Sequence, residues 1–558
     1  MSKVYKERTR AQESTNAIER LYISMRHLFS RGFYKPMGVS GETLRKSLLL
    51  LRPEIYGSIA EEKSELNGLT YIIERLPEGI EECQFINLTA DEGYRNSHFK
   101  CIVPPKRRRN CYRIDKDQMN IEITRGRSDI YDILTHLTFL FIESHKIKER
   151  VLLSDTGKTT REWSNLEEVV VKNITLSNKE KDVLMVHLGS ILGRTYDEVY
   201  QAYNTFSTED NPHRFFHLIY WLGKLAINEE LYDKKRSIRF SSVLSEEIGR
   251  HYHGERWAND IKEVLLKEGL ITRPIHIISA NMHSVLNSVY AKNAIPTEAE
   301  SNVGFSLFEL LSNSDSKLLQ TAVKNFASEN GLYYLKDKSG TNINVQVIDT
   351  GKISFDSEFI SDKNKDNAPV IIVMDYAFGE QAYETMDELL KPYKEGTNIH
   401  HLNVDSVSIM GKAGILEGGK GDIMIPSAHV FEGTADNYPF KNELTKEDLK
   451  GFGVEVFDGS MVTVLGTSLQ NKDLLKFFHD STWKVIGLEM EGAHYQKAIQ
   501  SASRIRETIG ENVKVRYAYY ASDNPLETGA TLASGGLGMS GVTPTYAITQ
   551  KILEQILK

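Results

Sequence analysis

Residues 485–509 read VIGLEMEGAHYQKAIQSASRIRETI, an apolar run that passes through two glutamates into an amphipathic pattern. The run 485–488 predicts a buried strand, and residues 493–509 predict a helix packed beside it. The same change from strand to helix recurs at 370–390 and 461–478. Repeated strand–helix units predict a mostly parallel sheet that carries helices on both faces.

Three more apolar runs, 404–410, 422–425 and 513–520, add strands to this predicted sheet. In open sheets of this class, ligands bind beyond the carboxyl ends of the strands. The residues that directly follow each predicted strand are therefore the candidates for a functional site.

The first part of the chain has a different pattern. Helical periodicity dominates up to about residue 335, for example over 17–29, 130–147 and 214–227, with a strand-like stretch at 71–124. We therefore expect a mainly helical region over residues 1–335, with a regulatory or oligomerising role, and an α/β domain over residues 340–558.

Composition excludes several classes of protein. The 558 residues carry a formal net charge of −8, which argues against a nucleic-acid-binding protein. The three cysteines form no C-x-x-C pair, so neither a disulfide framework nor a zinc ribbon is expected. The polar N-terminus and the absence of long apolar runs predict a cytoplasmic protein without a membrane partner.

Glycines follow the predicted strand 404–410. Gly411, Lys412 and Gly414 come directly after it, and glycine lets backbone N–H groups approach an anion or a sugar closely. A simple tight turn would explain the same residues. The segment matches neither G-x-G-x-x-G nor the Walker A pattern, so no nucleotide cofactor is predicted.

Acidic residues follow two other predicted strands. Glu489, Met490 and Glu491 come after 485–488, where they can bind a ribose or complement the dipole of the following helix. Ser522 and Asp523 come after 513–520, where the carboxyl group can serve a heterocycle nitrogen or form a turn before proline.

The order of these motifs resembles that of one superfamily. The pattern is similar to that of the purine nucleoside phosphorylase and nucleosidase superfamily. Its motifs are, in chain order, GKAGI with GDIMIP, GTSLQN, GLEMEGA and YYASDNP. The resemblance covers residues 340–558 and implies a three-layer α/β/α phosphorylase-like domain, a homo-oligomer, and a role in purine metabolism and nucleotide salvage. The extra N-terminal region resembles the layout of AMP nucleosidases.

The resemblance also implies roles for single residues. Glu491, beside Glu489, would accept hydrogen bonds from ribose hydroxyls, and Met490 would pack against the sugar. Asp523, oriented by Ser522, would hydrogen-bond or protonate purine N7. Leu469 and Gln470 would line the base pocket, although the family often places an aromatic residue at the position of Leu469.

The attacking group stays open between water and inorganic phosphate. Hydrolytic members use a glutamate near the first strand, which makes Glu380 the first candidate for the general base and Asp375 the second. Phosphorolytic members use an arginine in the first loop and another just before the glycine turn, and this sequence has no arginine at either place. Lys412 nevertheless offers a positive charge for phosphate. We expect hydrolysis that releases free base; the alternatives are phosphorolysis by a glycosyltransferase, or an inactive nucleotide-sensing module.

A basic cluster stands in the N-terminal region. A solvated loop is the ordinary interpretation, but its members are also candidates for an anion site because guanidinium groups suit phosphate oxygens: Arg107, Arg108, Arg109, Arg125 and Arg127. Histidines elsewhere lack a metal-binding motif, and no metal is predicted.

Overall fold

The computed structural model describes residues 9–558 apart from 154–156, 296–304, 314, 356–358, 360–366, 435 and 528–536. The chain forms two compact units. The first comprises Met1–Arg250 with the short segment Ser468–Asn471, and the second comprises His251–Thr467 with Lys472–Lys558.

The first unit combines helices with a mixed sheet. Its helices are α1 (Arg10–Arg31), α2 (Glu42–Leu51), α3 (Leu66–Ile73), α4 (Gly126–Val151), α5 (Arg161–Val171), α6 (Asn178–Leu192), α7 (Tyr196–Phe206), α8 (Arg214–Tyr232) and α9 (Ser242–Gly249). Its strands are β1 (Phe33–Tyr34), β2 (Phe85–Thr89), β3 (Cys101–Ile102), β4 (Cys111–Asp115), β5 (Gln118–Glu122), β6 (Leu152–Leu153), β7 (Lys158–Thr159) and β8 (Ser237–Phe240).

Helix α4 is the central helix of this unit. Most of its side chains are buried, because it packs against α2, α6 and α8 on different sides. The main sheet has the strand order β1-β8-β2-β5-β4-β3, so the strand-like stretch predicted at 71–124 is confirmed within it.

The second unit contains the predicted α/β pattern. Its helices are α10 (Tyr252–Lys267), α11 (Met282–Ala294), α12 (Phe305–Ser312), α13 (Lys317–Glu329), α14 (Gln381–Leu389), α15 (Lys472–Asp480), α16 (Gly492–Gln500) and α17 (Val542–Leu557). Its strands are β9 (Ile275–Ser279), β10 (Leu332–Leu335), β11 (Val345–Asp349), β12 (Val370–Met374), β13 (Tyr393–Glu395), β14 (Asn398–His400), β15 (Val404–Ile415), β16 (Ile423–Phe431), β17 (Asn437–Pro439), β18 (Val456–Thr463), β19 (Val485–Glu489) and β20 (Lys514–Asp523).

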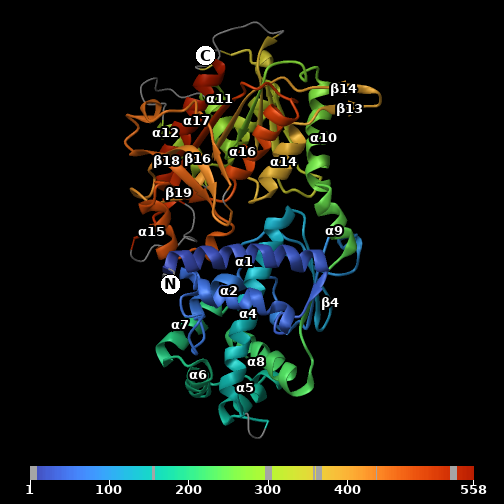
Figure 1. Ribbon diagram of the computed structural model, residues 1–558, viewed down its shortest axis with the longest axis vertical. Helices are drawn as coiled ribbons and strands as arrows, with labels where there is room; N and C mark the ends of the chain where they lie inside the picture. The colour runs from blue at the N-terminus through green and yellow to red at the C-terminus, as the bar shows by residue number, and fades with distance from the viewer. Residues whose placement is uncertain are drawn as a thin grey trace, which may run out of the picture. The chain divides into compact units, whose positions relative to one another are not determined.

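The main sheet of this unit runs β10-β11-β12-β9-β15-β19-β18-β16-β17, with β20 paired to β15 and β16. Helices cover both faces: α10, α14 and α16 pack on one side, and α11, α12, α13 and α17 pack on the other (Figure 1). The predicted arrangement of a sheet between two helical layers is therefore present in the second unit. The sheet is mixed, however, and not mostly parallel as predicted: β11 pairs antiparallel with β10 and β12, β15 with β19, and β16 with β17 and β20.

Alternating apolar residues produce these layers. In β12, Val370, Ile372 and Met374 enter one core, while Ile371 and Val373 enter the other. A strand that is buried on both faces needs apolar side chains at every position, which explains the continuous apolar run in the sequence.

The compact units divide at Arg250 and His251, whereas the sequence predicts a boundary near residues 335–340. The difference arises from β9, which lies between β12 and β15 and pairs parallel with both. Its three apolar residues, Ile275, Ile277 and Ile278, are too few to separate a strand from a helical segment by periodicity, and its partners lie about a hundred residues away.

Candidate active site

The end of β15 lies between the ends of β19 and β20 in the second unit. Gly414 pairs with Leu488 of β19 and also with Asp523 of β20. Because neighbouring strands lie about 4.8 Å apart, the two flanking strand ends stand about 10 Å from each other. Gly414 contributes no side chain to the space between the acidic residues that end these strands.

The last residues of β20 form a β-bulge. Ala413 pairs with Ala521 and Gly414 pairs with Asp523, so Ser522 is the extra residue on β20. A bulge bends its strand and redirects the neighbouring side chains. The Ser522 hydroxyl reaches two acceptors, the Ala413 carbonyl oxygen at 3.1 Å and Asp523 Oδ1 at 2.5 Å. Ser522 therefore contacts the carboxyl group of Asp523, and the catalytic role of the pair stays a prediction.

The other oxygen of Asp523 is arranged differently. The residue is 9% exposed, and Oδ2 is buried with no hydrogen-bond partner among the described residues. Burial raises the pKa of this carboxyl group, and the Ser522 hydrogen bond and the charge of Lys412 act against that rise. A buried oxygen without a partner is costly unless a ligand completes it, so Oδ2 is the candidate ligand contact.

Glu489 fixes the turn between β19 and α16. Its carboxyl group accepts hydrogen bonds from the hydroxyl of Thr463 on β18 and from the backbone N–H groups of Glu491 and Gly492. Burial raises its pKa to about 7 although these donors favour the ionised form. These three donors join Glu489 to β18 and to the start of α16, and its contact with a ribose stays a prediction.

Glu491 is half-buried and is the residue that precedes α16. Its Oε1 accepts a hydrogen bond from the Gly379 N–H at 2.8 Å, which joins the turn after β19 to the loop after β12. Burial and the nearby charge of Glu489 raise the pKa of Glu491 to about 8. Met490 lies beside it and is half-buried.

A buried histidine lies beneath this turn. His429 of β16 is fully buried, and a Cβ atom at Gly492 would stand 2.3 Å from its Nε2. The same nitrogen lies 3.3 Å from the hydroxyl of Tyr519. The glycine of the GLEMEGA motif is therefore required by the imidazole ring, a relationship that no pattern in the sequence predicts.

Gly411, Lys412 and Gly414 do not form a loop after the strand, and that prediction is wrong. They are residues of β15, which continues to Ile415 because its parallel pairing with β20 extends to Gly414 and Asp523. Lys412 is exposed on this strand, and its charge reaches Asp523. The turn itself follows at Gly418 and Gly421, both of which have positive φ angles.

The segment that holds Glu380 follows β12, which the sequence predicts as the first strand of the α/β domain but which is not the first strand of the second unit. β9 precedes it, and residues 280–284, which follow β9, read ANMHS and contain no carboxylate. Glu380 is half-buried and directly precedes α14, while Asp375 Oδ1 accepts from the Tyr376 N–H at 2.9 Å. The general base stays a prediction.

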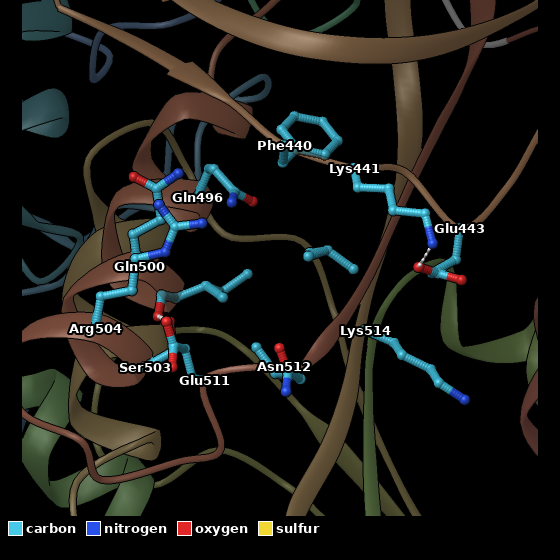
Figure 2. A pocket seen from close by; sticks show the side chains of 13 residues that line it. Phe440, Lys441, Glu443, Gln496, Gln500, Ser503, Arg504, Glu511, Asn512 and Lys514 are labelled. Atoms are coloured by element: carbon cyan, nitrogen blue, oxygen red, sulfur yellow. Dashed lines mark hydrogen bonds and ion pairs between the residues drawn. The ribbon is translucent and has the colours of Figure 1, made fainter.

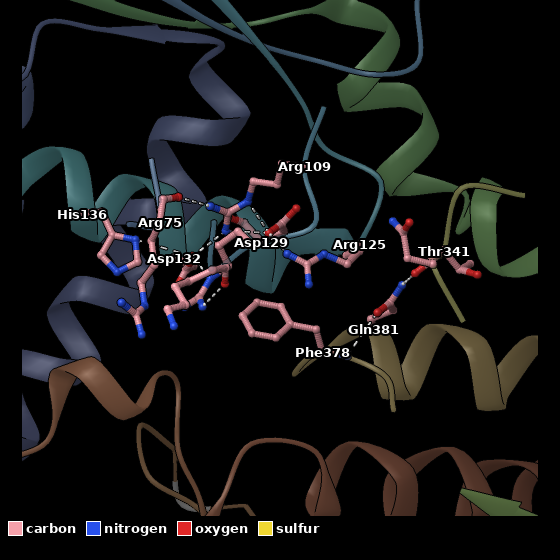
Figure 3. A network of polar contacts seen from close by, with 12 residues as sticks. Arg75, Arg109, Arg125, Asp129, Asp132, His136, Thr341, Phe378 and Gln381 are labelled. Atoms are coloured by element: carbon pink, nitrogen blue, oxygen red, sulfur yellow. Dashed lines mark hydrogen bonds and ion pairs between the residues drawn. The ribbon is translucent and has the colours of Figure 1, made fainter. Parts of the chain in front are cut away.

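Gln381 holds the loop before α14 in place. Its Nε2 donates to the Thr341 carbonyl oxygen at 2.8 Å, and its Oε1 accepts from the Phe378 N–H at 3.1 Å (Figure 3). The side chain is buried, so these contacts fix the backbone that presents the Gly379 N–H to Glu491.

Leu469 and Gln470, the predicted base-pocket residues, lie in the segment Ser468–Asn471 that packs with the first unit. Both are buried, and the Gln470 carbonyl oxygen accepts from the Glu54 N–H at 2.9 Å. Their role toward a base stays a prediction.

Three of the five arginines of the predicted anion site are held by aspartates of α4. Figure 3 shows Arg109 and Arg125 beside Asp129 and Asp132. Arg107 makes two hydrogen bonds to Asp132, at 2.9 and 2.8 Å. Arg109 donates to Asp129 at 2.7 Å and also pairs with Asp132, and Arg125 donates to Asp129 at 2.9 Å. These three guanidinium groups therefore already have anionic partners inside the protein.

The other members differ in exposure: Arg108 is exposed and Arg127 is half-buried. Nearby, His136 is fully buried, and burial lowers its pKa to about 3, so its imidazole is neutral. Binding of an external anion to this cluster stays a prediction.

Within the described ranges, two groups place metal-ligating atoms close together. They are Glu81 with Glu82 and His217, and His251 with Asp387 and Glu388. Cationic side chains already neutralise both groups, through the pairs Arg214–Glu81, Arg113–Glu82, Arg506–Asp387 and Lys391–Glu388. Neither group therefore presents a free ligand set.

Across the part of the chain that the structure describes, no helix is both long and apolar enough to span a membrane.

Comparisons with known proteins give one family and several solved structures that match about half of this chain. A model described as a family of unknown function, DUF6909, matches residues 42–300 and 292–558. No curated protein matches. Among solved structures, a 5′-methylthioadenosine/S-adenosyl homocysteine nucleosidase from Campylobacter jejuni is 10% identical, with a TM-score of 0.31 over 51% of this chain and 99% of that one.

Two other solved structures have similar identities, coverages and TM-scores. A futalosine hydrolase mutant of Helicobacter pylori is 13% identical, with a TM-score of 0.30 over 51% of this chain and 99% of that one. The Neisseria meningitidis 5′-methylthioadenosine/S-adenosylhomocysteine nucleosidase, in complex with methylthio-immucillin-A, is 11% identical, with a TM-score of 0.31 over 51% of this chain and 100% of that one.

Proposed function

The chain belongs to the DUF6909 family, whose function is unknown, and we propose that it cleaves the N-ribosidic bond of a purine nucleoside or nucleotide by hydrolysis. The observation that carries this proposal is the double pairing of Gly414 with Leu488 and Asp523. Through this pairing, Asp523 and the turn that holds Glu491 lie on opposite sides of Gly414. The distance between the two strand ends leaves room for a base beside Asp523 and a ribose beside Glu491.

Asp523 is suited to act as the acid. Its raised pKa keeps more of the carboxyl group protonated near neutral pH than for an ordinary aspartate. With Oδ1 fixed by Ser522, the proton is carried on Oδ2 toward the base nitrogen. Breaking the C1′–N bond leaves the electron pair on the base, and the proton from Asp523 neutralises it.

Glu491 is suited to bind the sugar. One carboxyl oxygen is fixed by the Gly379 N–H, which leaves the group oriented to accept from ribose hydroxyls. In the free protein the raised pKa of Glu491 leaves its carboxyl group largely protonated at neutral pH. As the bond to the base breaks, positive charge develops on the ribose, and the ionised form of Glu491 stabilises that charge. Water then attacks C1′ and gives up its proton to a base, for which Glu380 and Asp375 are the candidates.

Lys412 supports a second candidate reaction. Its side chain is exposed on β15 and its charge reaches Asp523, so it could hold inorganic phosphate at the same strand end. Phosphate would then attack C1′ in place of water and give ribose 1-phosphate.

Product analysis distinguishes these reactions. Purified protein is incubated with AMP, adenosine, inosine, guanosine and 5′-methylthioadenosine, each with and without phosphate, and the products are separated by chromatography. Free base without phosphate supports hydrolysis, and base released only with phosphate supports phosphorolysis. Tight binding of a purine nucleotide without base release would contradict both and favour a nucleotide-sensing module.

A further inference from the structure

A cavity of about 400 Å³ lies at the end of α16 that is remote from Glu491 (Figure 2). Its walls come from α16 and the π-helical turn Ser501–Ile505, from the start of β20, and from the segment after β17. Asp523 ends β20 while Lys514 begins it, so the cavity lies about 30 Å along the strand from the candidate active site.

The apolar part of the cavity includes a fixed aromatic ring. Phe440 lies beside Ile499 and Val515, and its ring is stacked on His429 at a centroid distance of 5.3 Å. The ring of Tyr517 contacts it at 4.7 Å. A ring that is held in this way can receive a flat ligand without losing further side-chain freedom.

A buried amide group faces the same space. Gln496 is 3% exposed, and its Oε1 accepts from the Tyr517 hydroxyl at 3.0 Å. Its Nε2 has no hydrogen-bond partner among the described residues, while the residue lines the cavity. The carboxamide is therefore oriented by Tyr517 so that its two N–H groups remain available to a ligand.

The charges of the cavity favour an anion. Lys441 and Glu443 neutralise each other at 3.0 Å, as Figure 2 shows. Arg504, Lys514 and Glu511 make no ion pair within the described residues, which leaves two positive charges and one negative charge. The excess positive charge and the Gln496 donors suit a carboxylate or a phosphate group.

We propose that this cavity binds a small organic anion with a flat apolar body, such as an aromatic carboxylate or a nucleoside monophosphate. The flat body stacks on Phe440, and the anionic group binds the Arg504 guanidinium and the Gln496 amide. The volume is within the range of small-molecule sites. This site is independent of the proposed cleavage reaction and of its substrate site.

The test uses the full-length protein with Glu491→Gln and Asp523→Asn, so that binding at the candidate active site is weakened. Calorimetric titrations use 1-naphthoate, AMP and inorganic phosphate. We expect binding of at least one flat-bodied anion, about tenfold tighter than that of phosphate. Adding Arg504→Gln weakens it about tenfold, and Lys476→Gln, which removes an exposed lysine of α15, leaves it unchanged.

A further variant, Phe440→Leu, separates the two parts of the site. It keeps an apolar side chain but removes the ring, so it weakens the flat-bodied anion and leaves phosphate unaffected, while thermal unfolding checks that the variant is folded. Binding of naphthoate or of AMP alone identifies which class of anion the cavity accepts. The proposal is overturned if neither binds at millimolar concentration, or if binding is unchanged by Arg504→Gln.

Discussion

The backbone N–H of Gly379 donates a hydrogen bond of 2.8 Å to Oε1 of Glu491, across 112 residues of sequence. This bond links the loop after β12 to the turn after β19, so the carboxyl group that would bind the ribose has a fixed position. Gly379 has a φ angle of 55°, a conformation that favours glycine, which explains why a glycine occupies this position.

We expect Asp523→Asn to reduce kcat by about a hundredfold or more, because an amide cannot transfer a proton to the departing base. Ser522→Ala should reduce kcat about tenfold, since the carboxyl group would keep its proton but lose its orientation. Steady-state kinetics with the substrate found by product analysis provides the measurement. Full activity of Asp523→Asn would exclude this residue as the acid.

Glu491→Gln should lower kcat/KM by about a hundredfold, since the amide group cannot stabilise positive charge on the ribose as a carboxylate does. The matched control is Glu447→Gln, which removes an exposed carboxylate of the same unit. Equal activity of the two variants would contradict the assignment of Glu491. A circular dichroism spectrum establishes that both are folded.

The stability of the second unit should fall as pH rises from about 5 to 8. Glu489 and Glu491 have folded-state pKa values of about 7 and about 8, above the ordinary value of 4.5. The folded state therefore binds more protons than the unfolded state in this window, and the free energy of unfolding decreases with pH.

Glu491→Gln should flatten this dependence and make the variant more stable than the parent at pH 8, by about 1–2 kcal/mol after allowance for solvent screening. Urea unfolding at pH 5, 6.5 and 8 measures the effect. A pH dependence identical to that of the parent would show that the folded-state pKa of Glu491 is not raised.

Gly492→Ala should destabilise the protein by about 1–3 kcal/mol, because the added methyl group would overlap the buried ring of His429. Gly510→Ala is the control, since a Cβ atom there has no heavy atom within 4 Å. Thermal unfolding compares the two. A Gly492→Ala protein as stable as Gly510→Ala would mean that the ring can move aside.

Lys412→Gln tests the influence of the exposed lysine on the acid. The positive charge lowers the pKa of Asp523, so its removal should raise that pKa further. The protonated acid then persists to higher pH, and the alkaline limb of the pH–rate profile moves upward. If base release requires phosphate, the same variant should also raise the KM for phosphate, which separates the two reactions.

Local pattern was sufficient for much of the second unit. The predicted strands 485–488 and 513–520 correspond to β19 and β20, and the predicted strand–helix unit 370–390 begins with β12, because strands that are buried on both faces need continuous apolar runs. The positions of Glu491 and Asp523 at strand ends follow from the same pattern. The same pattern did not predict β9, because three isoleucines interrupted by one histidine carry no distinctive period.

The arginine cluster shows that residue types alone do not determine which anion an arginine binds. Arg107 and Arg109 are predicted as ligands for an external anion, but Asp129 and Asp132 lie one turn apart on α4 and bind them. Their spacing of three residues puts the two aspartates on one face of a helix, but this spacing does not indicate which loop packs against that face.

By itself, the sequence determined the alternation of strands and helices, and therefore which acidic residues end a strand. Only the tertiary structure decided that Gly414 stands between Leu488 and Asp523, that Gly379 binds Glu491, and that His429 fills the space beside Gly492. The reason is physical: periodicity records which side of an element is buried, whereas these relationships depend on contacts between segments about 60 to 110 residues apart.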